Sequence, residues 1–135
     1  MRIAVIASLS VLALGGCATV APPSPCPAGQ EHMRTAQLFF GQNVAGQPAV
    51  PDADFRKFVD EELTPRFPEG LTVLDGGAQW KGSENKLIRE ASKVVVLVLP
   101  KTEERKKLGE VRQAYIQRFH QDSMLLVTQQ ACVVL

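Results

Sequence analysis

The chain of 135 residues is 45% hydrophobic and 21% charged, and its formal net charge at pH 7 is +1. Proteins that bind nucleic acid neutralise phosphates with clustered Lys and Arg side chains. The dense basic run Arg105-Lys106-Lys107 directly follows Glu103-Glu104, which is typical of a solvated helix face. The composition therefore excludes a strongly basic protein, and we expect no nucleic-acid partner.

The N-terminus predicts export. Arg2 precedes an apolar run from Ile3 to Leu14, which is shorter than the roughly 20 residues needed to cross a bilayer. The run ends in Leu14-Gly15-Gly16-Cys17, which is similar to the bacterial lipobox, in which the cysteine receives a diacylglyceryl group. We expect residues 1–16 to be a removed signal peptide and Cys17 to be lipidated. The alternative is an ordinary signal peptide with an incidental cysteine.

A lipid on Cys17 would hold the protein at a membrane. Each buried methylene contributes about 0.8 kcal/mol, so two or more acyl chains give a stable anchor. Ala18 follows Cys17, where lipoproteins retained in the inner membrane typically have aspartate, so we expect the outer membrane, facing the periplasm. The Pro-rich residues 17–32 predict an extended stalk, and residues 33–135 fit a single domain.

Hydrophobic patterns divide this domain into six elements. In the first, Ala36, Leu38 and Phe40 share one face of a strand. A Gly76-Gly77 pair indicates a bulge or bend before Gln79-Trp80. The patterns predict strands at 34–41, 70–75, 86–99 and 123–134, and helices at 51–63 and 102–119.

The order strand, helix, strand, strand, helix, strand predicts an α+β, ferredoxin-like βαββαβ sandwich. Such a fold has a four-stranded antiparallel sheet with two helices on one face, and its first and third strands are central. The unbroken apolar run 94–99 suits a central strand that is buried on both faces.

Two cysteines remain if Cys17 is lipidated. The fourth strand lies beside the first in this topology, which brings Cys132 near the stalk that carries Cys26. A disulfide is plausible in an oxidising compartment; closing a loop of roughly a hundred residues stabilises by about 4 to 5 kcal/mol in the chain-entropy model. The alternative is two unpaired thiols.

The sheet face away from the helices is also predicted to be apolar. Val94, Val96 and Val98 alternate with residues that face the helices, and a large uncovered apolar patch is unusual on a monomer. We therefore expect a homodimer through this open sheet face, or an apolar ligand lying on it. The alternative is that the stalk folds across the face.

Polar residues gather around the second and third strands and form the candidate ligand or partner site. In the functional interpretation Arg89 and Lys93 bind an anion and Trp80 is an apolar platform. In the structural interpretation these residues form a salt-bridged hairpin, with Arg66 on Asp75 and Arg89 or Lys93 beside Glu90. The complete candidate set is Arg66, Asp75, Trp80, Arg89, Glu90 and Lys93.

No catalytic motif, metal site or cofactor is expected. His32 and His120 have no neighbouring cysteine or carboxylate at ligand spacing, and neither a phosphate loop nor a nucleophile elbow occurs. We expect an envelope lipoprotein that binds an unknown envelope protein or a small ligand. The rival hypothesis is a small enzyme that uses the Arg89, Lys93 and Trp80 region.

Four segments of the domain match a known sequence pattern: Leu38-Phe39-Phe40-Gly41, Thr64 to Gly76, Gln79-Trp80, and Ile88-Arg89-Glu90-Ala91-Ser92-Lys93. Through these segments, and over nearly all of residues 33–135, the chain resembles a family of exported bacterial proteins, domain of unknown function 3574. This resemblance implies one exported domain and no particular activity. Ala91 stands where relatives often have proline.

Overall fold

A computed structural model describes residues 24–43, 49–100 and 104–135. The expected signal peptide and Cys17 lie outside the described residues. Among the described residues, no helix has the length and apolar character needed to span a membrane. The elements in chain order are β1 (Glu31–Gly41), α1 (Asp52–Phe58), the π-helical turn η1 (Val59–Leu63), β2 (Thr72–Lys81), β3 (Leu87–Leu99), α2 (Glu104–Phe119) and β4 (Leu125–Val133).

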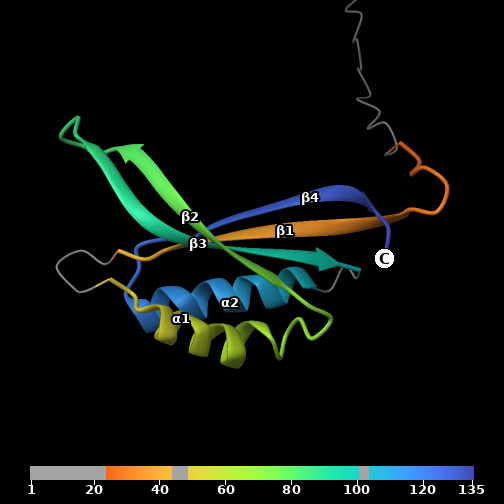
Figure 1. Ribbon diagram of the computed structural model, residues 1–135, viewed down its shortest axis with the longest axis horizontal. Coiled ribbons are helices and arrows are strands. Elements are labelled where there is room, and N and C mark those ends of the chain that lie inside the picture. The colour runs from red at the N-terminus through yellow and green to blue at the C-terminus, as the bar shows by residue number, and fades with distance from the viewer. Residues whose placement is uncertain (1–23, 44–48, 101–103) are drawn as a thin grey trace, which may run out of the picture.

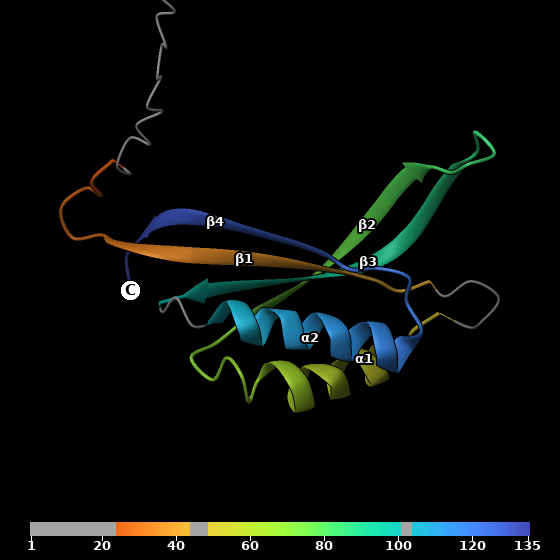
Figure 2. The ribbon, with the colours of Figure 1, turned by 180° about the vertical axis from the view of Figure 1, so that it is seen from behind.

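The strands form one antiparallel sheet in the order β2-β3-β1-β4. Both helices lie on the same side of this sheet, as Figures 1 and 2 show from opposite directions. The predicted ferredoxin-like fold is therefore confirmed, with β1 and β3 in the centre. The predicted neighbours β1 and β4 are also confirmed, with His32 directly opposite Cys132.

Aromatic side chains fill the space between the sheet and the helices. Phe40 projects from β1 as predicted and is fully buried, together with Ala36 and Leu38. Its ring meets those of Phe55 and Tyr115 edge to face, at centroid distances of 5.3 and 4.7 Å. Such arrangements place a ring edge on a ring face and add to the hydrophobic burial. This cluster fixes α1 and α2 against the end of β1.

Two strand ends, the start of β1 and the end of β2, differ from the sequence prediction by more than two residues. β1 begins at Glu31, because its ladder with β4 extends to the pair Glu31 and Val133, so the end of the expected stalk belongs to the sheet. β2 passes through Gly76 and Gly77 without a bulge or break in its register with β3. Glycine permits a bulge without requiring one, and here the ladder hydrogen bonds continue through the pair.

The expectation that the apolar run 94–99 of β3 is buried on both faces is wrong for the face that points away from the helices. Val95, Leu97 and Leu99 are buried beneath the helices, whereas Val98 on the other face is 38% exposed. The predicted open sheet face therefore exists among the described residues and is apolar. Its exposed large side chains, placed on one face by the strand registers, are Leu74, Trp80, Ile88, Val98, Leu125 and Val127.

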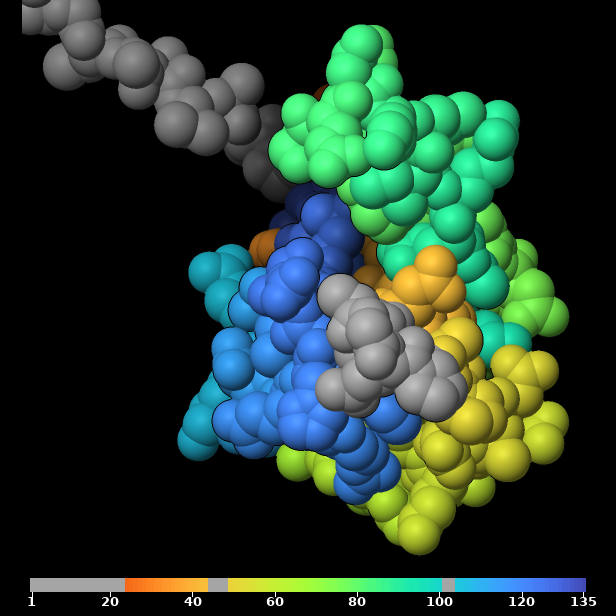
Figure 3. Space-filling model, turned by 90° about the vertical axis from the view of Figure 1, so that its left-hand side faces the viewer, coloured from red at the N-terminus to blue at the C-terminus, as the bar shows by residue number. Residues whose placement is uncertain are grey.

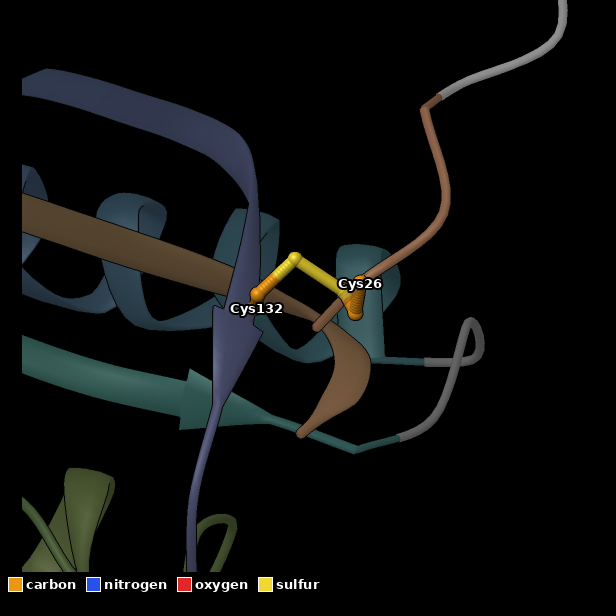
Figure 4. Close-up of a disulfide and its surroundings, with 2 residues drawn as sticks. All are labelled: Cys26 and Cys132. Carbon is orange, nitrogen blue, oxygen red and sulfur yellow. A yellow bond between two sulfur atoms is a disulfide. The ribbon is translucent and has the colours of Figure 1, made fainter. Parts of the chain in front are cut away.

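The expected disulfide joins Cys26 to Cys132, with a Cα–Cα distance of 5.5 Å and a sequence separation of 106 residues. Figure 4 shows the bond linking the segment before β1 to the end of β4. The tip of the β2–β3 hairpin lies at the opposite end of the molecule (Figure 1).

Candidate functional site

The open face is hollowed at the hairpin end of the sheet. Beyond the helices, β2 and β3 bend away from the rest of the sheet (Figure 1). Figure 3 looks onto this end and shows the green hairpin standing above the blue segment that joins α2 to β4. A cavity of about 670 Å³ lies here, and we call it the Glu90 hollow. Its lining includes Phe39, Trp80, Ile88, Glu90, Ser92 and Leu125.

Trp80 forms one wall of the Glu90 hollow. It faces Ile88 across the β2–β3 ladder, and the residue is 44% exposed. An aromatic ring with one face in contact with protein and the other reachable from solvent can stack on a planar ligand. Gly76 and Gly77 line the hollow beside Trp80, so no side chain from these two positions fills it.

Glu90 places a partly buried carboxylate in the hollow, whose lining is mainly apolar and also includes the exposed Asp122. Ser92, two residues along the same face of β3, is buried beside it. Desolvation by burial raises the pKa of Glu90 above its ordinary value of 4.5, although a hydrogen bond from the backbone N–H of Asn43 opposes the change. Within the part of the chain that the structure describes, Glu90 forms no salt bridge. A half-buried carboxylate without a cationic partner favours ligands that donate hydrogen bonds or carry positive charge.

A buried hydrogen-bond network supports the floor of the hollow. The Tyr115 hydroxyl donates to the carbonyl of Gly41 at 2.7 Å and accepts from Gln42 Nε2 at 3.2 Å. Burial, together with the negative charge of Glu90, raises the pKa of Tyr115, so this hydroxyl stays protonated and acts as a donor. The Gln42 amide also bonds the carbonyl of Phe40 at 3.2 Å. These contacts fix the backbone at the end of β1, next to Glu90.

The predicted site residues do not converge on one place. Trp80 and Glu90 line the same hollow. Arg89 lies on the opposite face of the hairpin, where its Nε donates to Gln79 Oε1 at 2.9 Å. Arg89 and Glu90 also border a shallower depression along the β2–β3 hairpin.

Lys93 joins three elements on the helix side of the sheet. Its ammonium lies 2.7 Å from Asp52 of α1 and 2.5 Å from Asp75 of β2. These carboxylates raise the pKa of Lys93, and Lys93 in turn lowers the pKa of Asp52. The structural interpretation of Lys93 is therefore favoured, with Asp52 and Asp75 as the partners in place of the predicted Glu90.

Arg66 lies far from this group. Its guanidinium contacts Glu62 at 2.8 Å and Glu110 at 3.4 Å, so the predicted pairing of Arg66 with Asp75 is wrong. The first of these partners is one helical turn earlier in sequence, and such a neighbour is closer than any residue of β2. Arg66 thus ties the end of η1 to α2.

Sequence reasoning missed Gly41, which lines the Glu90 hollow, and Gln42 and Tyr115, which hold the backbone of β1 beside it. The sequence prediction places Gly41 at the end of the strand 34–41 and Tyr115 within the helix 102–119, and it gives Gln42 no role. Gln42 and Tyr115 are 73 residues apart and share a hydrogen bond, so no local pattern pairs them. One sequence feature could have drawn attention to Gln42: it is a polar residue directly after an apolar strand. A buried amide at such a position needs a hydrogen-bond partner.

Comparison with solved structures shows the same fold elsewhere. The chain is similar to a phage SAM lyase in complex with S-methyl-5′-thioadenosine (TM-score 0.58, 13% identity, covering 85% of this chain and 97% of the lyase). The apo lyase gives a TM-score of 0.58 at 15% identity, with coverage of 84% and 97%. CPII, a nitrogen regulatory PII-like protein from Thiomonas intermedia K12 bound to ADP, AMP and bicarbonate, gives a TM-score of 0.45 at 13% identity, with coverage of 77% and 94%. At 13% and 15% identity the likeness to the lyase concerns the fold alone.

Comparison by sequence gives the family. A search of the curated proteins finds no match to the chain. A family model described as "Protein of unknown function (DUF3574)" matches residues 35–135, which include most of β1 and all of the other strands and helices. The resemblance found from the four sequence segments is thereby confirmed, and the chain belongs to the DUF3574 family.

Proposed function

We propose that this protein is a lipid-anchored envelope lipoprotein whose domain binds a small ligand in the Glu90 hollow. The anchor would be the lipid on Cys17, and the folded domain would lie on the periplasmic side of the outer membrane. The domain would thus act by binding and not by catalysis. It could bind a small ligand in the hollow and also contact a protein partner through the open sheet face.

One observation carries the proposal: a largely apolar cavity contains the partly buried carboxylate of Glu90, which no described cation neutralises. Ligand sites are concave and mostly apolar, with a few polar groups that fix orientation. Glu90 is such a group, and Trp80 supplies the aromatic wall. A carboxylate held only for fold stability would more commonly be exposed or paired, because burial disfavours its charged form.

The arrangement selects a chemical class of ligand. A planar apolar body fits against Trp80, and an N–H donor or a cation on that body would reach Glu90. Simple anions are disfavoured, since Glu90 would repel them and the cationic Arg89 and Lys93 lie on the opposite face of the hairpin. We therefore propose an aromatic or heteroaromatic ligand with a hydrogen-bond donor or a positive charge.

The position of the hollow suits an anchored protein. Cys26 lies nine residues after Cys17 in sequence and is fixed at one end of the sheet by the disulfide. β1 leads from that end to Gly41 over 11 residues, a length of about 35 Å at 3.3 Å per residue. The hollow therefore lies about the length of β1 away from Cys26. All four segments that carry the family resemblance contribute to its lining, through Phe39, Gly76, Trp80 and Ile88.

The enzyme hypothesis has less support. It requires Arg89, Lys93 and Trp80 to act together, yet the strand register places Trp80 on one face and the two basic residues on the other. The ion pairs of Lys93 with Asp52 and Asp75 further account for its charge.

Fluorescence of Trp80, the single tryptophan of the chain, tests the proposal. Titration with 2-phenylethylammonium and with phenylacetate compares a cation and an anion that share one ring. S-methyl-5′-thioadenosine, which is bound by the phage lyase of the same fold, gives a larger planar probe with donors. We expect saturable changes in emission with the ammonium and the nucleoside, and a much weaker response to phenylacetate.

Two variants make this test specific. Glu90→Gln removes the partly buried carboxylate, leaving only the exposed Asp122 in the lining, and should remove the preference for the ammonium over phenylacetate. Glu84→Gln removes one negative charge at the exposed hairpin tip, where Glu84 pairs with Lys86, and should leave the preference intact. Equal responses to both small probes in the unaltered chain, or an unchanged preference in Glu90→Gln, would refute the proposed role of Glu90.

A further inference from the structure

The disulfide end of the molecule holds a third potential metal ligand. Cys26, His32 and Cys132 each offer one donor atom, and these three atoms lie within 4.8 Å of one another. His32 is the direct cross-strand neighbour of Cys132, and Cys26 reaches the same place through the disulfide. His32 and Cys132 are exposed, so ions in solution can reach them.

We propose that reduction of the Cys26–Cys132 disulfide opens a zinc site made of both thiolates and His32. Zinc binds thiolate sulfur at about 2.3 Å and imidazole nitrogen at about 2.0 Å, usually with four ligands. Three protein donors within 4.8 Å of one another can surround one ion after small side-chain rotations. A water molecule would take the fourth position.

The chemistry balances with a dithiol as the reductant. The dithiol transfers two electrons and two protons to the disulfide, which becomes two thiols, and the dithiol becomes a disulfide. Zinc then displaces both thiol protons and accepts the neutral imidazole nitrogen of His32. The disulfide and the zinc complex are mutually exclusive, because both use the same two sulfur atoms.

The sequence prediction that no metal site exists rested on His32 having no nearby cysteine in the expected spacing. That argument fails in three dimensions, since the antiparallel pairing of β1 and β4 brings position 132 opposite position 32. The β1–β4 ladder also holds two of the three ligands in place without the disulfide. The proposed zinc site is independent of the Glu90 hollow at the other end of the sheet.

Cobalt provides a visible probe of this zinc site. The experiment uses the full chain carrying Cys17→Ser, so that the lipidation position contributes no thiol, with tris(2-carboxyethyl)phosphine to reduce the disulfide. We expect the reduced chain to bind one Co²⁺ with thiolate charge-transfer absorption that Zn²⁺ abolishes, and the oxidised chain to show no such band. In reduced His32→Ala, cobalt affinity should fall by about tenfold or more, the range that altered metal surroundings produce. His120→Ala, which lies outside the cluster, is the control and should bind normally.

Thermal unfolding followed by circular dichroism covers the case in which the reduced chain is poorly folded. Zinc that binds the native state raises its stability by mass action, so Zn²⁺ should raise the midpoint of the reduced chain and leave that of the oxidised chain unchanged. Absence of the thiolate band with no zinc-dependent rise in midpoint would overturn the proposal. Equal cobalt affinity in His32→Ala and the unaltered reduced chain would also overturn it.

Discussion

The carboxylate of Glu90 lies directly against the backbone of Gly41. A Cβ atom at position 41 would stand 2.8 Å from Glu90 Oε1, closer than carbon and oxygen atoms normally approach. Glycine at the end of β1 therefore lets Glu90 occupy its place in the hollow. Tyr115 also holds Gly41 in place, because its hydroxyl donates a hydrogen bond to the Gly41 carbonyl oxygen.

Gly41→Ala should displace Glu90 without unfolding the protein. The contacted atom is the far end of a flexible side chain, so we expect the free energy of unfolding to change by only about 0.5 kcal/mol. The Trp80 fluorescence response to 2-phenylethylammonium should nevertheless weaken. Gly109→Ala is the matched control, because no atom lies within 4 Å of its added Cβ. In α2 it should stabilise the fold by roughly 1 kcal/mol and leave the response unchanged. An unaltered response in Gly41→Ala would contradict this role of Gly41.

The raised pKa of Glu90 predicts a pH dependence of stability. The folded protein holds the Glu90 proton more tightly than the unfolded chain, whose carboxyl has the ordinary pKa of 4.5. Glu90 therefore favours folding at low pH, and this contribution decreases as pH rises through the raised pKa. Denaturant midpoints measured from pH 4 to 7 should show the stability of the unaltered chain falling relative to Glu90→Gln as pH rises. A difference that is constant with pH, or that grows with pH, would contradict the prediction.

Features set by neighbouring residues in the sequence could be predicted, whereas contacts between elements far apart in the sequence could not. The period-2 pattern of Ala36, Leu38 and Phe40 identified the buried face of β1, because strand geometry alone decides it. The order of elements gave the fold and brought Cys132 near Cys26. The contacts of Arg66 with Glu110 and of Lys93 with Asp52 were not predictable, since each joins elements whose mutual approach is set by tertiary packing. Asp75 is the cross-strand neighbour of Lys93, so the register of β2 and β3 decides that pair. The hollow depends on the bend of the β2–β3 hairpin. The Gly76-Gly77 pair indicates a bulge or a bend in β2, but it does not give the direction in which the hairpin bends.

The open sheet face predicts self-association. Val98 of β3 is 38% exposed on that face. Val73 of β2 is 42% exposed on the helix side of the sheet, so Val73→Lys is a matched control for Val98→Lys. Analytical ultracentrifugation at high micromolar concentration should show a dimer for the unaltered chain and for Val73→Lys, and a monomer for Val98→Lys. Burying an unpaired ammonium between two apolar sheets is strongly unfavourable. A monomer in the unaltered chain would exclude the dimer through this face.

Lipidation at Cys17 can be followed with radiolabelled palmitate. The unaltered protein should incorporate the label and sediment with membranes even in high salt, because acyl chains bind by hydrophobic burial. Cys17→Ala should lose both properties. Cys26→Ala, a second cysteine that belongs to the disulfide, should keep the label. Incorporation of palmitate into Cys17→Ala would show that the anchor is elsewhere or that the sequence Leu14-Gly15-Gly16-Cys17 is not a lipidation signal.

Nuclear magnetic resonance mapping tests the central claim, ligand binding in the Glu90 hollow, most directly. The indole N–H of Trp80 gives a unique signal, and the amides of Gly41 and Gly77 report two other walls of the hollow. On addition of 2-phenylethylammonium or S-methyl-5′-thioadenosine these signals should shift together and saturate, while the side chain of Arg66 at the end of η1 stays unchanged. Glu90→Gln should abolish the shifts caused by the ammonium. Saturable shifts confined to residues outside the hollow, or no shift of Trp80 with either probe, would contradict the account.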